Sequence, residues 1–591
     1  MIRAVFIFLA AVEIVFLYIN SQDGDVLGTF SYSTGDDKEG TETNTIEYTA
    51  AVLDYEAYDD ISLGGLALLQ ENARILLGYA AQAQRQGADI IVFPEHGLTG
   101  SNTGTTLEAL VSLSQIVPEP EDEVIPCYFT DANDASKVVQ ELSCGAMELR
   151  MYLVVQMTEQ QCANGTVKTD FESGFPSTDG VNRPIASAQG EECPKRDLLF
   201  FNTQVVFSDT GVVVAKYRKK HLYVESHLSK GEQPDEAAMF TTSFGVTFTL
   251  QICFDIMYRD PAISNIETYG LHDAILSTNW IDELPFLTAP QMWKAWSEGN
   301  KVNLLASNYF KPSQGALGSG IFRGYTSEPA TYVYNAAGGT SLVVGKVTTT
   351  PVSSVSTTRS DFRPILSYCQ SPVNNYEETG SIQREALDSK ESPCESVYSH
   401  SNPVESNTFP LLVAEDQTFL HEDLQRYNHS IIEWTSTTNP SNCTKTLCHE
   451  DGFCCTVEYD YPRNDTEGGL FMILAYSGLV VKGGGIYPMY SQICSIVFCL
   501  NATAMSCARV EGEPVRHSNL RVYELRGNFG NSHVYPSVFT QSLELYSSRN
   551  WEFDVQERSG FFDGVIRFRE TVKSLLSLTM FSRWYERDPG E

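Results

Sequence analysis

The sequence predicts an α/β fold followed by a smaller, mainly β, disulfide-stapled domain. Residues 48–93 show strand, helix and strand patterns in that order, which is typical of an α/β layer fold. Strand patterns with crowded cysteines recur in the last third of the chain, after a Ser/Thr/Pro-rich segment. A chain of 591 residues is also too long for one ordinary core. We therefore expect two folded domains.

Two segments precede the first domain. A positive charge at Arg3 comes before the apolar run 4–19, and polar residues follow, so we interpret residues 1–22 as a secretory signal peptide. An uncleaved signal anchor is the alternative, although Glu13 interrupts the apolar run. Residues 23–45 are rich in Gly, Ser, Thr and Asp without apolar periodicity, and they predict a flexible leader.

The first domain is expected over residues 46–345. Its first strand is predicted at 48–55, and the helix predicted at 66–86 carries apolar residues at helical spacing. These apolar residues are Leu69, Ala73, Leu76, Ala80 and Ala83. The continuous apolar run 88–93, which a glycine and a proline bound, predicts a strand buried on both faces.

The later elements of this domain are predicted from β-branched and aromatic runs. Residues 198–207 and 212–217 predict a hairpin, because Ser-Asp-Thr-Gly separates the two runs. The remaining predictions are strands at 244–252, 273–277 and 302–306, and a helix at 285–299.

A linker and a second domain complete the expected organisation. Residues 346–400 are rich in Ser, Thr and Pro and predict a linker. The second domain is expected over 401–591, with strands at 411–414, 471–481 and 493–500. The role of this domain stays open at this stage.

Fourteen cysteines favour an oxidising compartment and disulfide bonds, whose pairing the sequence leaves open. Zinc is the rival interpretation. No Cys-x2-Cys pair occurs and the nearby histidines lack ligand spacing, so we expect no metal site. If Cys253 is kept as a free thiol, an odd number remains, and at least one more cysteine does not pair within the chain.

These features predict a secreted, extracellular glycoprotein. Sequons that predict N-linked glycans stand at Asn164, Asn428, Asn442, Asn464 and Asn501. Residues 580–591 are polar and form no hydrophobic tail, so we expect no stable membrane anchor. The formal charge of -35 disfavours nucleic acid as a partner. We expect a monomer.

Three predicted strand ends carry different reactive side chains, namely Glu95, Lys219 and Cys253. A carboxylate, an ammonium and a thiol suffice to hydrolyse an amide through a covalent acyl intermediate, without a metal or organic cofactor. Taken singly, each has a structural interpretation: a solvated turn acid, a basic loop, and a core or disulfide cysteine. In an α/β layer fold, however, adjacent strand ends open into one crevice where distant side chains converge.

The residues around these positions resemble the signature blocks of the nitrilase superfamily of carbon-nitrogen hydrolases. The blocks are Phe-Pro-Glu at 93–95, Tyr-Arg-Lys-Lys-His-Leu at 217–222, and Cys-Phe-Asp-Ile at 253–256 followed by Arg-Asp-Pro at 259–261. Further segments resemble the vanin and biotinidase branch, at 215–225, 302–308, 318–321 and 447–455. The motifs of both expected domains occur in order, so the resemblance covers most of the chain.

The resemblance implies a four-layer α-β-β-α sandwich with Glu95 as general base and acid, Lys219 as oxyanion stabiliser and Cys253 as nucleophile. Lys220 competes with Lys219, because successive strand residues face opposite ways and only one of the two can point inward. The Tyr-Arg-Lys match selects Lys219. Glu225 matches an acidic residue of the related block and is expected to orient the lysine or the substrate, with a surface-loop role as the alternative.

The resemblance also implies a small-molecule amide substrate, pantetheine, cleaved to pantothenate and cysteamine. Biocytin and other biotinyl amides are the alternative substrates. A non-catalytic secreted glycoprotein is the alternative from another class. The candidate substrate-binding residues are Asn279, Trp280, Asn308 and Tyr309, although aromatic side chains at such positions more often pack in a core.

Overall fold

The structure, a computed structural model, describes residues 45–100, 106–130, 132, 134–162, 198–352, 417–435, 443–462, 470–510 and 513–590. Several expectations lie outside the described residues. These are the signal peptide 1–22, the leader except residue 45, the linker from 353 onward, the strand at 411–414, and the sequons at Asn164, Asn442 and Asn464.

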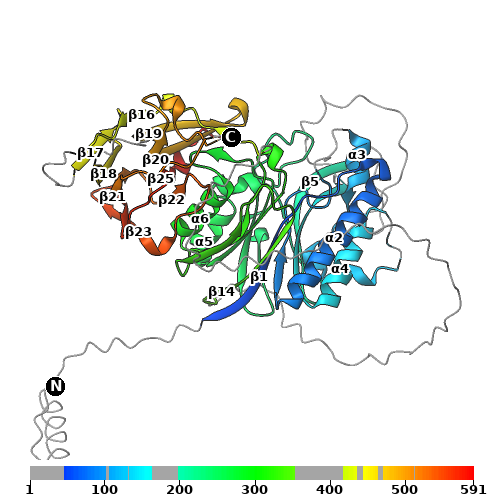
Figure 1. Cartoon of the computed structure of the whole chain (residues 1–591). Coiled ribbons are helices and arrows are strands. Elements are labelled where there is room, and N and C mark those ends of the chain that lie inside the picture. The colour runs from blue at the N-terminus through cyan, green and yellow to red at the C-terminus, as the bar shows by residue number, and fades with distance from the viewer. Residues whose placement is uncertain are drawn as a thin grey trace, which may run out of the picture. The chain divides into compact units, whose positions relative to one another are not determined.

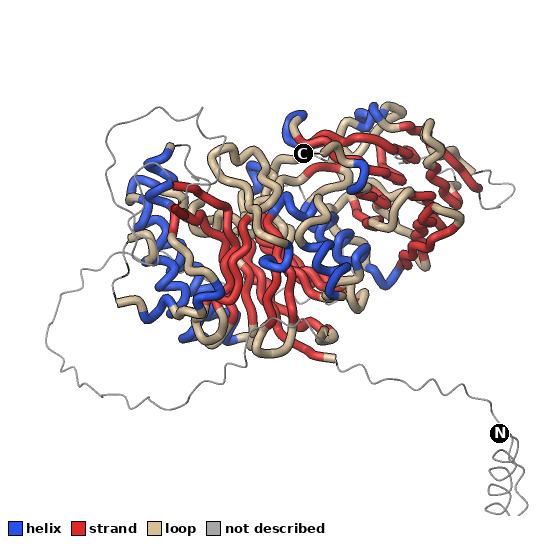
Figure 2. Tube along the Cα trace, turned by 180° about the vertical axis from the view of Figure 1, so that it is seen from behind, coloured by secondary structure: helices blue, strands red, loops and turns tan. Residues whose placement is uncertain are grey.

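Two β-sheets lie face to face at the centre of the first domain, and helices cover their outer faces (Figures 1 and 2). Within the described residues, the first sheet has the order β14 (Ser341–Thr349), β1 (Ile46–Asp54), β2 (Ile90–Val92), β4 (Tyr152–Cys162), β5 (Leu198–Phe207) and β6 (Val213–Arg218), with β3 (Ser114–Gln115) beside β4. The second has the order β13 (Glu328–Val333), β12 (Ser319–Arg323), β11 (Asn303–Asn308), β9 (Asp273–Thr278), β8 (Thr247–Ile252) and β7 (Met239–Thr241).

The helices complete the expected four-layer α-β-β-α arrangement. Against the first sheet lie α2 (Gly65–Arg85), α3 (Leu107–Leu113) and α4 (Lys137–Leu149), and on the side of the second sheet lie α5 (Ala262–Tyr269) and α6 (Ala289–Asn300). The apolar face predicted for the first helix is buried in α2, from Leu69 to Ala83. Each fully buried leucine side chain stabilises the fold by roughly 1.5–3 kcal/mol.

Strand β1 contributes side chains to two hydrophobic cores, one between the two sheets and one between the first sheet and its helices. Ala50 and Val52 are buried between the two sheets, whereas Ala51 and Leu53 are buried against the helices. Successive strand side chains point to opposite faces, so a strand in the middle of four layers must be apolar on both sides. The continuous apolar character predicted for the neighbouring strand β2 has the same cause, since all three of its residues are buried.

Among the predicted boundaries that the structure shifts, three have a clear physical reason. Strand β14 runs to Thr349, past the expected domain end at 345, because Val347 and Thr349 are buried and the strand pairs with β1 along its whole length. Strand β8 begins at Thr247 rather than 244, since a turn with a left-handed Gly245 precedes it. Helix α6 begins at Ala289 rather than 285, where Asp282 accepts a 2.7 Å hydrogen bond from the Ala289 N–H.

The C-terminal region is mainly β, as expected. Among the described residues, one sheet has the order β16 (Asn428–Ile431), β19 (Leu470–Lys482), β20 (Tyr487–Cys499), β25 (Leu575–Arg583) and β22 (Val534–Thr540). The other has the order β17 (Cys443–Cys448), β18 (Cys454–Asp460), β21 (Arg521–Phe529), β24 (Phe561–Phe568) and β23 (Trp551–Arg558).

Disulfide bonds staple this region. Cys455 of β18 pairs with Cys494 of β20 and so joins the two sheets. Two further bonds, Cys448–Cys454 and Cys499–Cys507, close short loops in the same region. In the first domain, Cys127 pairs with Cys144.

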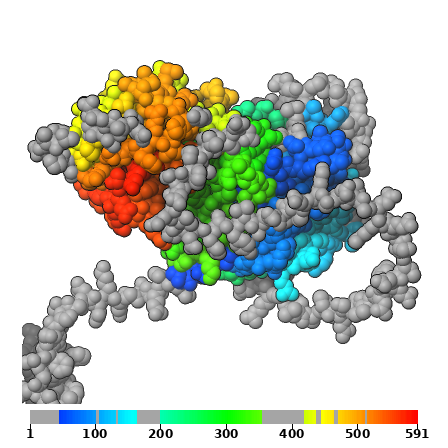
Figure 3. Space-filling model, in the orientation of Figure 1, coloured from blue at the N-terminus to red at the C-terminus, as the bar shows by residue number. Residues whose placement is uncertain are grey.

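The C-terminal region packs directly on the first domain, and the described residues from 45 onward belong to one compact unit. Ser577 of β25 donates a 3.0 Å hydrogen bond to the Pro285 carbonyl, and Arg583 Nε donates one of 3.0 Å to the Met257 carbonyl. A short parallel pair, β10 (Glu283–Leu284) with β15 (Leu420–His421), links the two parts again. Figure 3 shows the green surface of the first domain adjoining the yellow to red C-terminal surface.

Candidate active site

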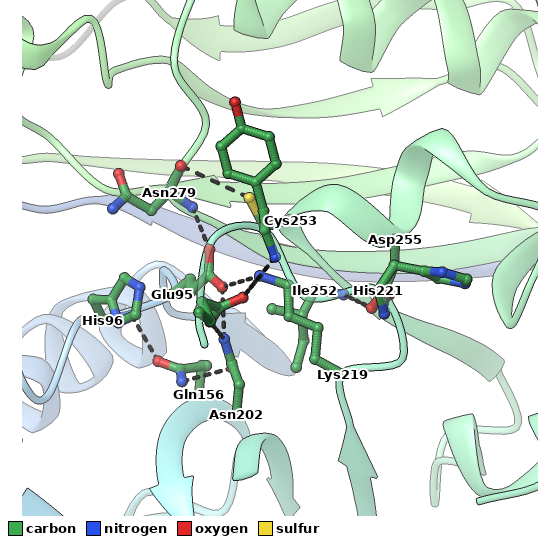
Figure 4. Close-up of polar contacts among 12 residues, drawn as sticks. Glu95, His96, Gln156, Asn202, Lys219, His221, Ile252, Cys253, Asp255 and Asn279 are labelled. Carbon is green, nitrogen blue, oxygen red and sulfur yellow. Dashed lines mark hydrogen bonds and ion pairs between the residues drawn. The ribbon is translucent and has the colours of Figure 1, made fainter. Parts of the chain in front are cut away.

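The three reactive residues follow strand ends, and their side chains lie close together (Figure 4). Glu95 comes shortly after β2, Lys219 directly follows β6, and Cys253 directly follows β8 at the start of the 3-10 turn Cys253–Met257. All three side chains are buried and line one cavity. The convergence expected from the strand ends is therefore present.

Glu95 is held by three hydrogen bonds. Its Oε1 accepts from Lys219 Nζ at 2.8 Å and from Asn202 Nδ2 at 2.8 Å, and its Oε2 accepts from the Asn279 N–H at 2.9 Å. Gln156 donates to Asn202 Oδ1 at 2.8 Å and thereby fixes the amide that faces the carboxylate. The Lys219 ammonium and the Asn202 amide thus hold one oxygen of Glu95, and a backbone N–H holds the other.

Lys219 lies between two carboxylates. Besides its bond to Glu95, Nζ donates a 2.7 Å hydrogen bond to Glu225 Oε2. Asn202 bridges the same pair, because its Nδ2 also donates to Glu225 Oε1 at 2.7 Å. Glu225 therefore contacts the lysine directly and lines the same cavity.

Lys220 points to another part of the molecule, where it forms an ion pair with Asp235. The register that the Tyr-Arg-Lys match selects is thus present in the structure, with Lys219 inside and Lys220 outside the cavity. The alternation of side chains across β6 continues into these two residues.

A tight turn presents the Cys253 sulfur. Cys253 has a left-handed φ of 45°, which is uncommon for residues other than glycine. Asp255 fixes the turn by accepting hydrogen bonds from the Ile252 N–H at 3.0 Å, the His221 N–H at 2.9 Å and the Tyr217 hydroxyl at 2.8 Å. The same carboxylate thus ties the strand end that carries Cys253 to the segment that carries Lys219 (Figure 4).

The Cys253 thiol is free of disulfides and donates a 3.7 Å hydrogen bond to the Asn279 carbonyl. Burial and the Glu95 carboxylate raise the pKa of the thiol, with Lys219 acting in the opposite direction. The resting sulfur is therefore protonated, and it needs a base when it reacts.

The pKa values of Glu95 and Lys219 shift in opposite directions, and both shifts favour the charged forms. Burial would raise the pKa of Glu95, but the Lys219 ammonium and the hydrogen bonds outweigh it and lower that pKa. Burial would likewise lower the pKa of Lys219, but Glu225 and Glu95 raise it well above its usual value. The site accordingly holds a carboxylate, an ammonium and a thiol, which is the set that acyl transfer through sulfur requires.

The cavity beside these residues has a volume of about 170 Å³. Two of the four candidate substrate-binding residues, Asn279 and Trp280, line it. Asn308 and Tyr309 do not belong to its lining. Asn308 accepts the Trp280 N–H at 2.8 Å from behind the wall, and Tyr309 packs in the core between the first sheet and its helices.

Three further residues in or beside the cavity carry no recognisable signal in the sequence. Asn202 lies within β5 and was expected only as part of a strand. His96 follows Glu95 with a left-handed φ of 62°, and its N–H donates a 2.6 Å hydrogen bond to Gln156 Oε1. Lys482 comes from the C-terminal region. Only the folded arrangement shows that these residues belong to the site.

Glu95, His96 and Glu225 present ligand atoms within 4.8 Å of one another. Both carboxylates, however, already bind the Lys219 ammonium at 2.7–2.8 Å. A divalent cation at this position would face that positive charge at close range, so the donor set does not suit a metal.

Two family models match separate parts of this chain. A family model described as carbon-nitrogen hydrolase matches residues 65–296, and one described as the vanin C-terminal domain matches residues 417–588. A pantetheinase of Bos taurus is 26% identical over 526 residues, covering 88% of this chain and 85% of the relative.

Biotinidases resemble this chain with comparable sequence identity and coverage. A biotinidase of Takifugu rubripes is 29% identical over 531 residues, covering 89% of this chain and 90% of the relative. A biotinidase of Homo sapiens is 26% identical over 583 residues, covering 94% of this chain and 92% of the relative. Among the described residues, no helix is both long and apolar enough to span a membrane.

Proposed function

Because the chain belongs to the vanin and biotinidase branch of the carbon-nitrogen hydrolases, we propose that it cleaves a linear carboxamide through a thioester on Cys253. The observation that carries this proposal is the meeting of Glu95, Lys219 and a disulfide-free Cys253 in one buried cavity. Each residue then has a defined chemical role.

Acylation begins with proton transfer from the Cys253 thiol to Glu95. Because the pKa of the thiol is raised, attack and deprotonation occur together rather than from a preformed thiolate. The sulfur forms a bond to the amide carbon, and the carbonyl oxygen becomes an oxyanion. The intermediate then collapses, the C–N bond breaks, and protonated Glu95 gives its proton to the leaving amine.

Hydrolysis of the thioester completes the cycle. Glu95 takes a proton from a water molecule, whose oxygen attacks the acyl carbon, and the carboxylic acid leaves as the C–S bond breaks. The sulfur recovers its proton from Glu95. Glu95 thus acts as base and acid in each half-reaction.

Lys219 stabilises the negative charge of both tetrahedral intermediates, and the Phe254 N–H next to the nucleophile is a second donor. A well-placed donor in a buried site is worth about 3–4 kcal/mol in the transition state. Glu225 keeps the ammonium in position through its 2.7 Å hydrogen bond.

The substrate that the relatives favour is pantetheine, which yields pantothenate and cysteamine. Five of the relatives carry the name pantetheinase, each from a different mammal, which supports this choice. Biotinyl amides such as biocytin are the second candidate, because the biotinidase of Takifugu rubripes shows 29% identity, against 26% for the pantetheinase of Bos taurus.

A side-by-side assay tests the proposal. Purified full-length protein is offered pantetheine and biocytin in reducing buffer, and the release of amine is measured beside a Cys253→Ala variant. Turnover of one amide by the wild type alone supports the proposed function and selects its substrate. Absence of turnover on both amides would refute the substrate assignment.

We also propose that the protein is secreted and carries N-linked glycans. The side chain of Asn501 is exposed, and that of Asn428 is half-buried and donates a 3.1 Å hydrogen bond to the Cys448 carbonyl. The four disulfide bonds among the described residues suit an oxidising compartment. Glycosidase treatment of protein from the culture medium of expressing cells, followed by electrophoresis, would show a mass decrease if glycans are present.

A further inference from the structure

A buried ion-pair cluster lies at the same cavity as the catalytic residues. Lys482 Nζ donates 2.8 Å hydrogen bonds to both carboxylate oxygens of Glu283 and another of 2.8 Å to Glu422 Oε2. Lys482 and Glu283 line the cavity together with Cys253. The mechanism above uses neither of them.

The cluster joins the two parts of the chain. Glu283 lies in β10 of the first domain, whereas Lys482 ends β19 of the C-terminal region. Glu422 directly follows β15, the strand that pairs with β10. Leu420 of β15 also lines the cavity, so the C-terminal region supplies both an apolar and a charged group to its wall.

An aromatic contact fixes this region against the nucleophile. Tyr487, at the start of β20, packs on Tyr223 with ring centroids 5.3 Å apart and on Phe254 at 5.1 Å. Its hydroxyl accepts a 2.7 Å hydrogen bond from the Val224 N–H. Phe254 follows Cys253 directly, so the β19–β20 hairpin is anchored beside the reacting sulfur.

From these contacts we propose that Lys482 and Glu283 form a polar subsite that binds the acyl tip of the substrate, so that the C-terminal region helps to select the substrate. This inference rests on the proposed function and deepens it. Both side chains are 11–17% exposed, which leaves them open to a ligand in the cavity and otherwise shielded from solvent. Hydrogen bonds in such a site are stronger than in water.

The chemistry of the subsite suits a group that both donates and accepts hydrogen bonds. The ammonium of Lys482 donates, and the carboxylate of Glu283 accepts. One ammonium faces two carboxylates here. Burial raises the pKa of Glu283 to about 7, with Glu422 adding to the effect and Lys482 opposing it, so Glu283 can also hold a proton near neutral pH.

The acyl part is the long, polar-tipped part of both candidate substrates. Pantothenoyl ends in two hydroxyl groups and biotinyl ends in a cyclic urea, and each group donates and accepts hydrogen bonds. In biotinyl a chain of methylene groups separates the tip from the scissile amide, and in pantothenoyl an internal amide and two methylene groups do so. The apolar Trp280, Leu287 and Leu420 in the same cavity suit such a chain.

Steady-state kinetics on two substrates test the inference with full-length protein. One is whichever of pantetheine and biocytin the wild type hydrolyses, and the other is an N-alkanoyl derivative of the same amine (cysteamine or lysine), which keeps the scissile amide but lacks the polar tip. Lys482→Met is expected to raise KM for the tipped substrate by about ten- to hundredfold, because a charged hydrogen bond is lost. The change in kcat should be much smaller. For the N-alkanoyl substrate, which lacks the polar tip (the tipless amide), KM should change little.

The control is Lys445→Met. Lys445 also lies in the C-terminal region, where it donates a 2.6 Å hydrogen bond to the Ile431 carbonyl away from the cavity, so neither KM should change. Glu283→Gln serves as a second variant that decides the question if Lys482→Met does not fold. It should show the same substrate-dependent rise in KM.

The outcomes separate the two proposals. An unchanged KM in Lys482→Met, or an equal loss on tipped and tipless amides, would overturn the subsite and leave the hydrolase intact. No turnover of any amide by the wild type would refute the proposed function and the subsite together.

Discussion

The Lys219 ammonium donates a 2.8 Å hydrogen bond to Oε1 of Glu95, and the side chains of both residues are only 2% exposed. A pair so deeply buried is stable only if further hydrogen bonds satisfy it, and Asn202, Asn279 and Glu225 supply them. The arrangement keeps Glu95 ionised and Lys219 charged until a substrate arrives. Four predictions follow from this arrangement and from the fold that holds it.

Lys219→Ala should lower kcat by about 10²- to 10³-fold, because the oxyanion loses its charged donor. Lys220→Ala is the matched control, since Lys220 pairs with Asp235 outside the cavity, and it should keep most of the activity. Amine release under saturating substrate measures both variants. The reverse result would mean that Lys220 is the residue that faces the substrate.

Glu225→Gln should reduce kcat by about ten- to hundredfold while the protein stays folded. The amide can still accept a hydrogen bond from Lys219, but it loses the charge that holds the ammonium at 2.7 Å. Thermal melting beside kinetics distinguishes this positioning effect from loss of structure. Full activity in the variant would show that Glu95 alone positions the lysine.

The pH dependence of kcat/KM should change in Asn202→Leu. The Asn202 amide donates to Glu95 and is one of the groups that lower its pKa, whereas burial raises it. Removing the amide therefore raises the pKa of Glu95, and the acid limb of the profile should move to higher pH. The wild-type limb lies lower because the carboxylate stays ionised until the pH falls through its lowered pKa. A limb that stays in place or moves to lower pH would contradict this assignment of the base.

Removal of the bond between Cys455 and Cys494 should lower the free energy of unfolding by about 2–5 kcal/mol. This disulfide joins two different sheets of the C-terminal region and closes a separation of 39 residues. The control is removal of Cys448–Cys454, which spans 6 residues between strands that already pair, and it should cost less. Denaturant unfolding of the two double alanine variants compares them, and equal losses would count against a stapling role between the sheets.

Sequence alone predicted that the three reactive residues, which depend on local pattern, would lie together. Glu95, Lys219 and Cys253 each follow a strand whose composition is unmistakable, and the ends of neighbouring strands in an α/β fold meet at one edge. The four-layer arrangement came from the family resemblance and is present. The sequence pattern predicts too early a start for α6, because the Asp282 carboxylate, which lies before the predicted helix, accepts a hydrogen bond from the Ala289 N–H.

The remaining site residues depend on contacts between distant segments. Lys482 and Glu283 are 199 residues apart, and nothing in the composition around either one indicates the other. Asn202 looks like any polar residue within a strand until the fold turns it toward Glu95 and Glu225. Asn308 and Tyr309 show the opposite case, since they stand at the end of β11 near the site but do not belong to the cavity lining.

The most direct test is to trap the acyl-enzyme. The wild type and Cys253→Ala are mixed with the amide that turns over, quenched in acid within the first turnovers, and examined by intact-protein and peptide mass spectrometry. The account predicts an added mass equal to the acyl group on the peptide that contains Cys253, and neither adduct nor turnover in the alanine variant. An adduct on another residue, or turnover by Cys253→Ala, would contradict it.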